Sequence, residues 1–412
     1  MKRSMYEMCK CSPEEIVELK LIESAFNKTK IDESFCSNIN WENVFEDLKA
    51  QAVASVAIDV VCDMGDRISD DVLKTWISFA MKTVSRNEKI LYYQSELIEL
   101  LGEIPCDAII LKGTSASRYY PNPIYRTMGD IDILVDKRVY KQALQLMLNN
   151  DYIQTHEFDE TRHHVELKKN KVIFELHREP SGISAGSYGE KIRKIFYDNI
   201  NNIDCVNING YKCNSYTKKC NGLVLLLHIV NHIDFGLGLR QVCDWMGFVK
   251  EELDDEYWYR EFAPMLREIG LEKLAIIVTK LCKMYLGLDG LTWCDSADEK
   301  ICAEFMRYVL DKGNFGHKKN DTPGTVAVLG RNKEFKSKFF IVNFIHSMQR
   351  EGFIEMKRDN RRPKIKCLVW TYPILQYFIK LITGKKTIKH TKKLFKEIRQ
   401  DKSLRDKLDI YK

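Results

Sequence analysis

Two aspartates separated by one residue are the clearest candidates for chemistry in this chain. Asp130 and Asp132 flank Ile131 in an apolar run that ends at Val135. On a strand, residues two apart point to the same face, so the two carboxylates would project side by side while Ile131 and Ile133 face the core. Two ionised carboxylates repel unless a cation lies between them. Because such a pair is also common on solvated surface strands, it needs a second feature to support metal binding by hard oxygen ligands, which suit Mg²⁺.

The second feature is a glycine break 17 residues before the first aspartate. Residues 108–111 form an apolar run that is short enough for a buried strand. After Gly113, two hydroxyl residues, Thr114 and Ser115, lead into a predicted helix that reaches residue 120. Backbone N–H groups at the start of a helix bind phosphate. A phosphate site beside a carboxylate pair is the minimal equipment for metal-assisted nucleotidyl transfer.

This part of the chain resembles an uncharacterised nucleotidyltransferase family of the DNA polymerase β-like superfamily. The resemblance rests on residues 112–113 (Lys-Gly), 120–121 (Tyr-Pro), 126–135 (Arg-Thr-Met-Gly-Asp-Ile-Asp-Ile-Leu-Val), 174–177 (Phe-Glu-Leu-His) and 236–245, and covers about residues 90–315. Thr114 stands where the superfamily has Gly or Ser. The spacer from Ser115 to Gly129 is 15 residues, longer than the common superfamily range. Both departures fit the subfamily better than the superfamily at large.

The resemblance implies a third carboxylate on a strand beside the aspartate pair. Residues 172–177 alternate, so that Glu175 shares one face with His177 while the other face is apolar. A carboxylate on a mostly apolar strand is costly to bury unless it is paired or bound to metal. Glu175 is therefore the candidate, and Glu166 and Glu179 are its rivals.

The resemblance also implies a reaction and a set of nucleotide ligands. The reaction would move a nucleoside monophosphate from an NTP to a hydroxyl acceptor. Asp130, Asp132 and Glu175 would hold two Mg²⁺ ions, with Mn²⁺ as an alternative. Of the remaining candidates, Arg126 is ranked above Lys112 for neutralising charge on the leaving pyrophosphate. The residues that would bind the NTP are Lys112, Gly113, Thr114, Ser115, Arg126 and Arg240.

The resemblance leaves the acceptor open between a sugar, a small molecule and a protein. It places many relatives among polysaccharide-biosynthesis genes, which favours a sugar or small-molecule acceptor. A function of another class also fits: a catalytically degenerate protein that binds a nucleotide, or an assembly protein at a membrane surface.

The flanking sequence predicts an α+β fold, with a small mixed β-sheet nucleotidyltransferase core embedded between helical N-terminal and C-terminal regions. We expect a helical region over 1–100, the core over 101–210, a helical domain over 211–325 and a basic helical region over 326–412. Ser12, Pro13 and Glu15 form a helix start with a capping box.

Within these regions the apolar spacing predicts individual elements. Helices are expected over 41–61 and 72–101, with a further helix that Asp136 caps and that runs to residue 148. Strands are expected over 152–158 and 164–167.

Residues 223–232 predict a buried helix with His228 and His232 four residues apart. The pair could bind zinc, but no Glu follows the first histidine as in metalloproteases, so hydrogen-bonded core histidines or contacts to nucleotide or acceptor are favoured. Arg240 and Asp244 have the same spacing. They would either pair on their helix or leave Arg240 to reach a triphosphate.

Charge is unevenly distributed along the chain. Residues 331–412 hold 23 Lys and Arg but 8 Asp and Glu, whereas the rest of the chain is acidic. This segment could contact an anionic membrane or a nucleic acid, although an amphipathic helix packed on the preceding domain is favoured. The apolar stretch over 367–383 is too interrupted to span a bilayer.

The start of the chain and the cysteines bear on its location. No apolar run follows the basic start, so no signal peptide is expected. The 13 scattered cysteines lack zinc-finger spacing. Together these features predict a reduced cytoplasmic protein, with peripheral contact to the inner face of the membrane as an option.

Overall fold

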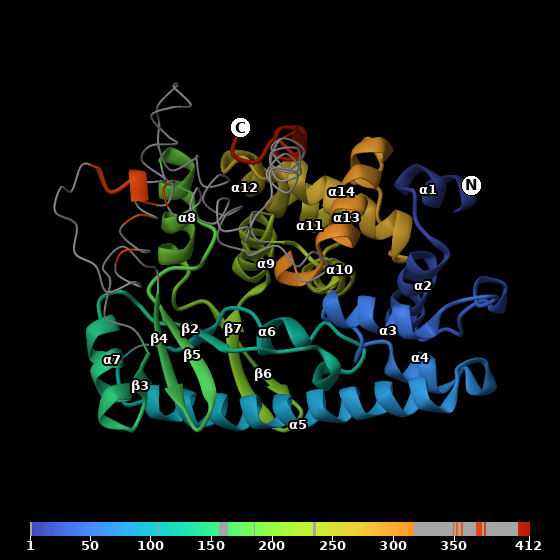
Figure 1. The fold of residues 1–412 in the computed structure, drawn as a ribbon. Helices are drawn as coiled ribbons and strands as arrows, with labels where there is room; N and C mark the ends of the chain where they lie inside the picture. Colours follow the sequence, from blue (N-terminus) through green and yellow to red (C-terminus); the bar gives the residue numbers. More distant parts are fainter. Residues whose placement is uncertain are drawn as a thin grey trace.

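A five-stranded mixed sheet is the centre of the α+β fold, with the strands in the order β1–β2–β5–β4–β3 (Figure 1). Pairing is parallel between β2 and β5 and antiparallel between the other neighbours. A separate hairpin is formed by β6 and β7. The strands are β1 (Ile109–Ile110), β2 (Ile131–Leu134), β3 (Ile153–Gln154), β4 (His164–Lys169), β5 (Val172–His177), β6 (Ile203–Ile208) and β7 (Tyr211–Tyr216).

The computed structural model describes residues 2–105, 107–155, 164–184, 186–233, 236–316 and 403–412, together with residues 349, 352, 356, 368–372 and 375. Its helices are α1 (Lys2–Cys9), α2 (Pro13–Asn27), α3 (Trp41–Ala50), α4 (Ile58–Cys62), α5 (Asp70–Leu101), α6 (Thr114–Ser117), α7 (Tyr140–Asn149), α8 (Ser187–Asp198), α9 (Lys218–His232), α10 (Leu239–Glu252), α11 (Asp255–Tyr257), α12 (Ala263–Glu268), α13 (Glu272–Tyr285) and α14 (Glu299–Lys312).

Alternation along β2 and β5 gives the sheet one apolar and one mixed face. Ile131, Ile133, Phe174 and Leu176 point to the face covered by the second half of α5 and by α7, and all four are buried. The side chains between them, which include Asp132 and the carboxylate of its register partner Glu175, point to the opposite face. The acidic side chains therefore lie where the helical C-terminal half covers the sheet rather than where α5 does.

The 32-residue helix α5 runs along the whole base of the molecule (Figure 1). Its first half, with Trp76 and Ala80, packs under the N-terminal helices, and its second half, with Leu91 and Leu97, packs under the sheet. Between the two halves the buried Asn87 donates hydrogen bonds to the carbonyls of Ile124 (2.7 Å) and Arg126 (2.8 Å). This amide fixes the loop that leads directly into the aspartate pair.

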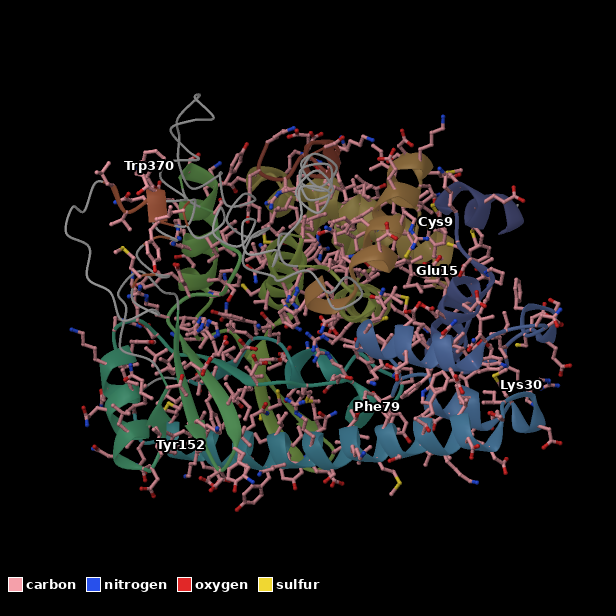
Figure 2. The ribbon with its side chains drawn as sticks, in the orientation of Figure 1. Cys9, Glu15, Lys30, Phe79, Tyr152 and Trp370 are labelled. Carbon is pink, nitrogen blue, oxygen red and sulfur yellow. The ribbon has the colours of Figure 1, made fainter. Side chains whose placement is uncertain are left out.

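The predicted helix start at Ser12 is confirmed. Ser12 Oγ accepts from the Glu15 N–H, and the Glu15 carboxylate accepts from the Ser12 N–H at 2.9 Å. Arg307 of α14 donates to the same Glu15 side chain at 2.8 Å. Figure 2 shows Glu15 and Cys9 where α1 and α2 meet the helices of the C-terminal half. The two ends of the described fold are thus joined in one core.

The prediction of one continuous helix over 41–61 is wrong. The chain turns after Ala50, where Ala52 adopts a positive φ of 59°, and α4 starts only at Ile58. The buried Gln51 side chain donates to the Val309 carbonyl at 3.0 Å and accepts from the Leu239 N–H at 2.8 Å. These long-range hydrogen bonds hold the break, and the apolar periodicity of the segment gives no sign of them.

Two smaller predictions are also corrected. Asp136 does not cap α7, which starts at Tyr140, because its carboxylate accepts hydrogen bonds from Arg138 instead. The strand expected over 152–158 is reduced to β3, and residues 156–158 lie outside the described part of the chain. The helices predicted over 72–101 and 223–232, and the strand expected from residue 164, are confirmed as α5, α9 and β4.

Most of the basic segment 331–412 falls outside the described residues, so its contact with membrane or nucleic acid stays a prediction. Among the helices that the structure describes, none combines the length and apolar character needed to cross a membrane.

Replacement of Asn87 tests how the loop is held. Asn87→Ala leaves two buried carbonyls without their donor, which should lower the free energy of unfolding by about 2 kcal/mol or more. Glu88→Ala changes the exposed neighbour on the same helix and should stay within about 0.5 kcal/mol of the wild type. Urea unfolding of the three proteins measures both values, and equal stability of the two variants would contradict the assignment.

Candidate active site

Three carboxylates converge at the centre of the mixed face of the sheet. One oxygen from each of Asp130, Asp132 and Glu175 lies within 4.8 Å of the others. The parallel register of β2 and β5 produces this arrangement because it sets Asp132 directly opposite Glu175. The rival carboxylates are engaged elsewhere, since Glu166 accepts from the Thr155 hydroxyl at 2.6 Å and Glu179 accepts from Arg193 at 2.6 Å.

Two basic side chains contact these carboxylates. Lys112 Nζ lies 3.1 Å from Asp132 Oδ1, and His177 Nε2 lies 2.9 Å from the same oxygen and 3.1 Å from Glu175 Oε2. Asp132 and His177 are almost fully buried, at 1% and 0% exposure. The charge of Asp132 is therefore neutralised by one lysine and one histidine.

The pKa values follow from this packing. Burial opposes charge on His177, but its hydrogen bonds to Asp132 and Glu175 raise the histidine pKa to about 9. Burial also opposes charge on Glu175, yet the hydrogen bond and charge of His177 lower the Glu175 pKa to about 2. The pKa of Asp130 is raised, first by burial and then by the charge of Asp132. Asp130 is thus the member of the group that most lacks a positive partner.

The donor set fits a divalent cation. Asp132 uses Oδ1 for both of its basic contacts, and Oδ2 is buried without a hydrogen-bond partner among the described residues. A buried carboxylate oxygen without a donor is costly unless a ligand or ion satisfies it. Two further carboxylate oxygens lie within reach of the same point. Oxygen donors of this kind are the ligands that Mg²⁺ and Mn²⁺ take in proteins.

The glycine turn before α6 lies against the aspartate pair. Gly113 has a φ of 64°, and a Cβ at this position would lie 3.6 Å from the Asp130 carbonyl oxygen. The left-handed backbone explains the glycine. The helix that follows is shorter than predicted, because α6 ends at Ser117 rather than at residue 120.

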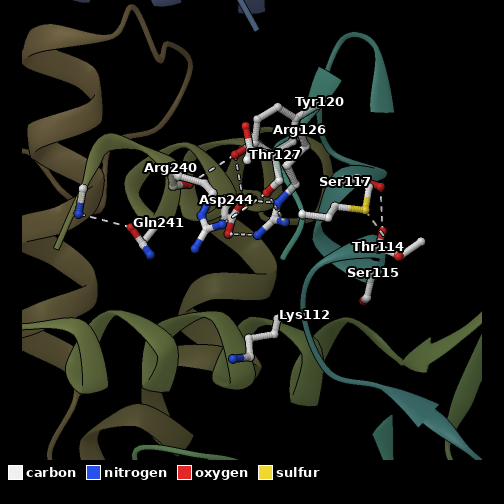
Figure 3. A network of polar contacts seen from close by, with 12 residues as sticks. Lys112, Thr114, Ser115, Ser117, Tyr120, Arg126, Thr127, Arg240, Gln241 and Asp244 are labelled. Carbon is white, nitrogen blue, oxygen red and sulfur yellow. Dashed lines mark hydrogen bonds and ion pairs between the residues drawn. The ribbon is translucent and has the colours of Figure 1, made fainter. Parts of the chain in front are cut away.

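The hydroxyl groups of this turn point into the protein. Thr114 Oγ1 lies 3.6 Å from the Met128 sulfur, and Ser115 Oγ lies 3.3 Å from Asn221 Oδ1. Figure 3 shows both side chains on α6, apart from Lys112. Any phosphate at this turn would therefore meet backbone N–H groups rather than the two hydroxyls.

Arg126 forms a buried ion pair with Asp244 of α10. Its Nε and Nη2 atoms donate to the two carboxylate oxygens of Asp244 at 2.7 and 2.6 Å, and both residues are at most 2% exposed. The Tyr120 hydroxyl donates to the same carboxylate at 2.7 Å (Figure 3). The side chain expected at the pyrophosphate is thus held in a structural pair that joins the motif loop to α10.

Because Asp244 pairs with Arg126, Arg240 does not pair with Asp244, and its charge remains close to the three-carboxylate group. Its Nη1 donates to the Thr127 carbonyl at 3.2 Å and its Nη2 to Asn314 Oδ1 at 3.4 Å, while Nε is buried without a partner among the described residues. Asp244 receives its hydrogen bonds from Arg126 and Tyr120 instead of from this neighbour on its own helix. Arg240 carries a positive charge that acts on Asp130, whose pKa it lowers against the effect of burial.

His228 and His232 are buried core residues. Their rings lie 4.5 Å apart, and His232 Nδ1 is 3.3 Å from the Gly236 carbonyl. Burial lowers the pKa of both, that of His232 to about 3. Neither belongs to a group of three or more metal-ligating side chains within the described ranges.

Comparison with known protein families agrees with this geometry. The profile of a family described as "uncharacterised nucleotidyltransferase" matches residues 37–287, more than half of the chain. The chain belongs to this nucleotidyltransferase family. No significant match was found among curated proteins or among solved structures. The family match includes the sheet, the three carboxylates and helices α9 and α10, and it supports nucleotidyl transfer as the general activity of the chain.

His177 and His164 lie beside the three carboxylates, and the sequence interpretation assigned a role to neither. Alternation along residues 172–177 already placed His177 on the face of Glu175, which was the available signal. His164 lies opposite His177 in the β4–β5 register, and its Nε2 is 3.7 Å from Glu175 Oε1. The register depends on the turn at Asn170 and Lys171, so this contact could not be read from spacing alone.

Removal of one partner of the buried pair should reveal its structural role. Arg126→Ala leaves Asp244 charged and buried, which should lower the free energy of unfolding by about 3–5 kcal/mol. Arg260→Ala breaks an exposed pair with Glu256 and should cost about 0.5 kcal/mol or less. Chemical denaturation of both variants provides the comparison, and similar losses in the two would count against the structural role.

Proposed function

We propose that this family member is a Mg²⁺- or Mn²⁺-dependent enzyme that transfers a nucleoside monophosphate from an NTP to a hydroxyl acceptor and releases pyrophosphate. The observation that carries the proposal is the convergence of Asp130, Asp132 and Glu175 around a buried, partnerless Asp132 oxygen. Family membership supports the transfer of a nucleotidyl group. The ion and the type of acceptor follow from the donor set and from the resemblance.

Asp130, Asp132 and Glu175 would hold the ions. When bound, two divalent ions supply charge neutralisation for the triphosphate and a lower pKa for the acceptor hydroxyl. The acceptor oxygen forms a bond to the α-phosphorus, and the bond from that phosphorus to the bridging oxygen breaks to release pyrophosphate. Glu175 accepts the proton of the acceptor hydroxyl at a carboxylate oxygen.

Two positively charged side chains, Lys112 and Arg240, would bind the triphosphate. Lys112 lies on the β1 side of Asp132, and Arg240 contacts the Thr127 carbonyl in the loop before the aspartates. Both can neutralise negative charge that develops on the leaving pyrophosphate. Because Arg126 is paired with Asp244, we assign this role to Lys112 and Arg240 ahead of Arg126. The turn at Gly113 contributes backbone N–H groups rather than the Thr114 and Ser115 hydroxyls.

The three carboxylates provide the direct test of catalysis. Asp130→Asn, Asp132→Asn and Glu175→Gln should each lower the rate of nucleotidyl transfer by about 100-fold or more, because each removes a metal ligand. Glu166→Gln is the matched control on the neighbouring strand and should retain the wild-type rate. The assay follows pyrophosphate release from each NTP with Mg²⁺ or Mn²⁺, in the presence of sugar, small-molecule and protein acceptors.

The same proteins distinguish catalysis from binding alone. Calorimetry with each NTP and Mg²⁺ should show binding to the wild type and weaker binding to Asp132→Asn. Binding without pyrophosphate release from any acceptor would support the degenerate nucleotide-binding protein instead. Equal heat signals from wild type and Asp132→Asn, with no binding in either, would refute both assignments.

Arg240 should act on the nucleotide rather than on the fold of α10. Arg240→Gln keeps a donor for the Thr127 carbonyl but removes the charge, so KM for the NTP should rise about 10-fold or more. Arg118→Gln, which changes an arginine that interacts with Glu252 and Asp204, should leave KM unchanged. Steady-state kinetics of both variants measures the difference, and an equal KM in the two would remove Arg240 from the nucleotide site.

A further inference from the structure

A second cluster of ligating side chains lies on the β4 side of the carboxylates. Atoms of His164, Glu175 and His177 that could ligate a metal lie within 4.8 Å of one another. His164 and His177 are direct partners in the antiparallel β4–β5 register, with ring centroids 4.9 Å apart. Glu175 extends from the same face of β5, two residues before His177. The cluster thus shares one carboxylate with the three-carboxylate group.

The chemistry of this cluster differs from that of the three-carboxylate group. Two imidazoles and one carboxylate form the ligand set that Zn²⁺ takes in catalytic sites that keep one position open. Imidazole nitrogen favours Zn²⁺ and related transition ions, whereas Mg²⁺ prefers oxygen and rigid octahedral geometry. The histidine-containing half of the site is therefore a poor site for Mg²⁺.

The surroundings allow an ion to enter. The His164 side chain is 26% exposed and that of Glu175 is 18% exposed, so the cluster is accessible to solvent on the β4 side of the carboxylates. His177 is fully buried, and its Nδ1 has no hydrogen-bond partner among the described residues. A buried histidine is thus held by one ring nitrogen beside two carboxylates, and the ring of a second histidine lies tilted beside it.

We propose that His164, Glu175 and His177 form a distinct metal site for a transition ion such as Zn²⁺, adjoining the Asp130–Asp132 site through the shared Glu175. The metal site follows from these side chains alone, and its use in catalysis rests on the proposed function. In that reaction the ion would lie on the side of Glu175 away from Lys112, which is the acceptor side. The site would then hold an ion with nitrogen and oxygen ligands beside the ions bound by oxygen alone.

The competing explanation is a purely structural pair of histidines. In that case His164 and His177 neutralise Glu175, with Lys112 completing the balance of charge, and no ion binds. The two explanations differ in what residue 164 does when a metal is added. A ligand at this position changes the spectrum of the metal itself, whereas a neutralising residue does not.

Binding of Zn²⁺ and Co²⁺ to the full chain without nucleotide tests the proposal. We expect the wild type to bind Zn²⁺ in calorimetry in the presence of excess Mg²⁺, and His164→Gln to bind it at least about 100-fold more weakly. His228→Gln is the control for loss of an imidazole outside the cluster and should match the wild type. Circular dichroism shows whether each variant keeps its fold.

The Co²⁺ spectrum identifies the ligand directly. The wild type should give visible absorption without sulfur-to-metal charge transfer, although the chain has exposed thiols at Cys62 and Cys205. His164→Cys replaces the nitrogen with a thiolate and should add an intense charge-transfer band, because residue 164 would then be a sulfur ligand. Identical Co²⁺ spectra of the wild type and His164→Cys, or Zn²⁺ affinity unaffected by His164→Gln, would overturn the proposal.

These outcomes are independent of the activity assay. If Zn²⁺ binds through His164 but no NTP is turned over, the metal site stands and the proposed function fails. If pyrophosphate is released with Mg²⁺ while His164→Gln changes neither metal binding nor spectrum, the function stands and the second site is absent.

Discussion

Repulsion among three clustered carboxylates, of which Asp132 is fully buried, is the constraint on which the rest of the structure depends. Two unit charges 4 Å apart interact by about 4 kcal/mol at an effective dielectric constant of 20. That is a large fraction of the 5–15 kcal/mol that typically separates folded from unfolded protein. Lys112 and His177 offset this repulsion by binding Asp132 and Glu175. The site thus has more carboxylates than these two positive partners, and added cations can neutralise the remaining negative charge.

The surrounding helices keep this centre rigid without contributing the carboxylates. Asn87 of α5 holds the carbonyls of the loop before Asp130, and Asp244 of α10 holds the Arg126 side chain of the same loop. The loop is therefore fixed from below by a neutral amide and from above by a buried ion pair. Preorganisation of this kind matters because a metal site needs its ligands held in position before the ion arrives. The long helix α5 also joins the N-terminal helices to the sheet, so the scaffold is continuous.

Local features of the site could be predicted from the sequence, and long-range ones could not. The alternation of apolar and polar residues places Asp130, Asp132 and Glu175 on one face, because strand periodicity is a local property. The turn at Gly113 could also be predicted locally, because the glycine comes just after the short apolar run over 108–111. The Arg126–Asp244 pair joins residues 118 positions apart, and spacing along one helix favoured Arg240 as the partner of Asp244.

The break in the predicted helix over 41–61 has the same cause as that missed pairing. The helix ends at this point, and the Gln51 side chain forms hydrogen bonds with residues more than 180 positions away. These hydrogen bonds stabilise a turn that helix propensity alone disfavours. The fold class could be predicted because helix and strand patterns repeat within a few residues. The long-range hydrogen-bond partners of buried polar side chains could not be predicted, because they depend on which distant segments of the chain pack together.

The order of the strands gives the site a direction. Lys112 follows β1 at one end of the sheet, the aspartates lie on and just before β2, Glu175 lies on β5, and His164 lies on β4. Positive charge suited to phosphate is therefore found on one side of the carboxylates, and imidazole nitrogen on the other. A hydroxyl that attacks a phosphorus held on the β1 side must approach from the opposite side for in-line displacement. Under the proposed function, this strand order favours an acceptor on the β4 side of the carboxylates, where His164 and Glu175 are the partly exposed side chains.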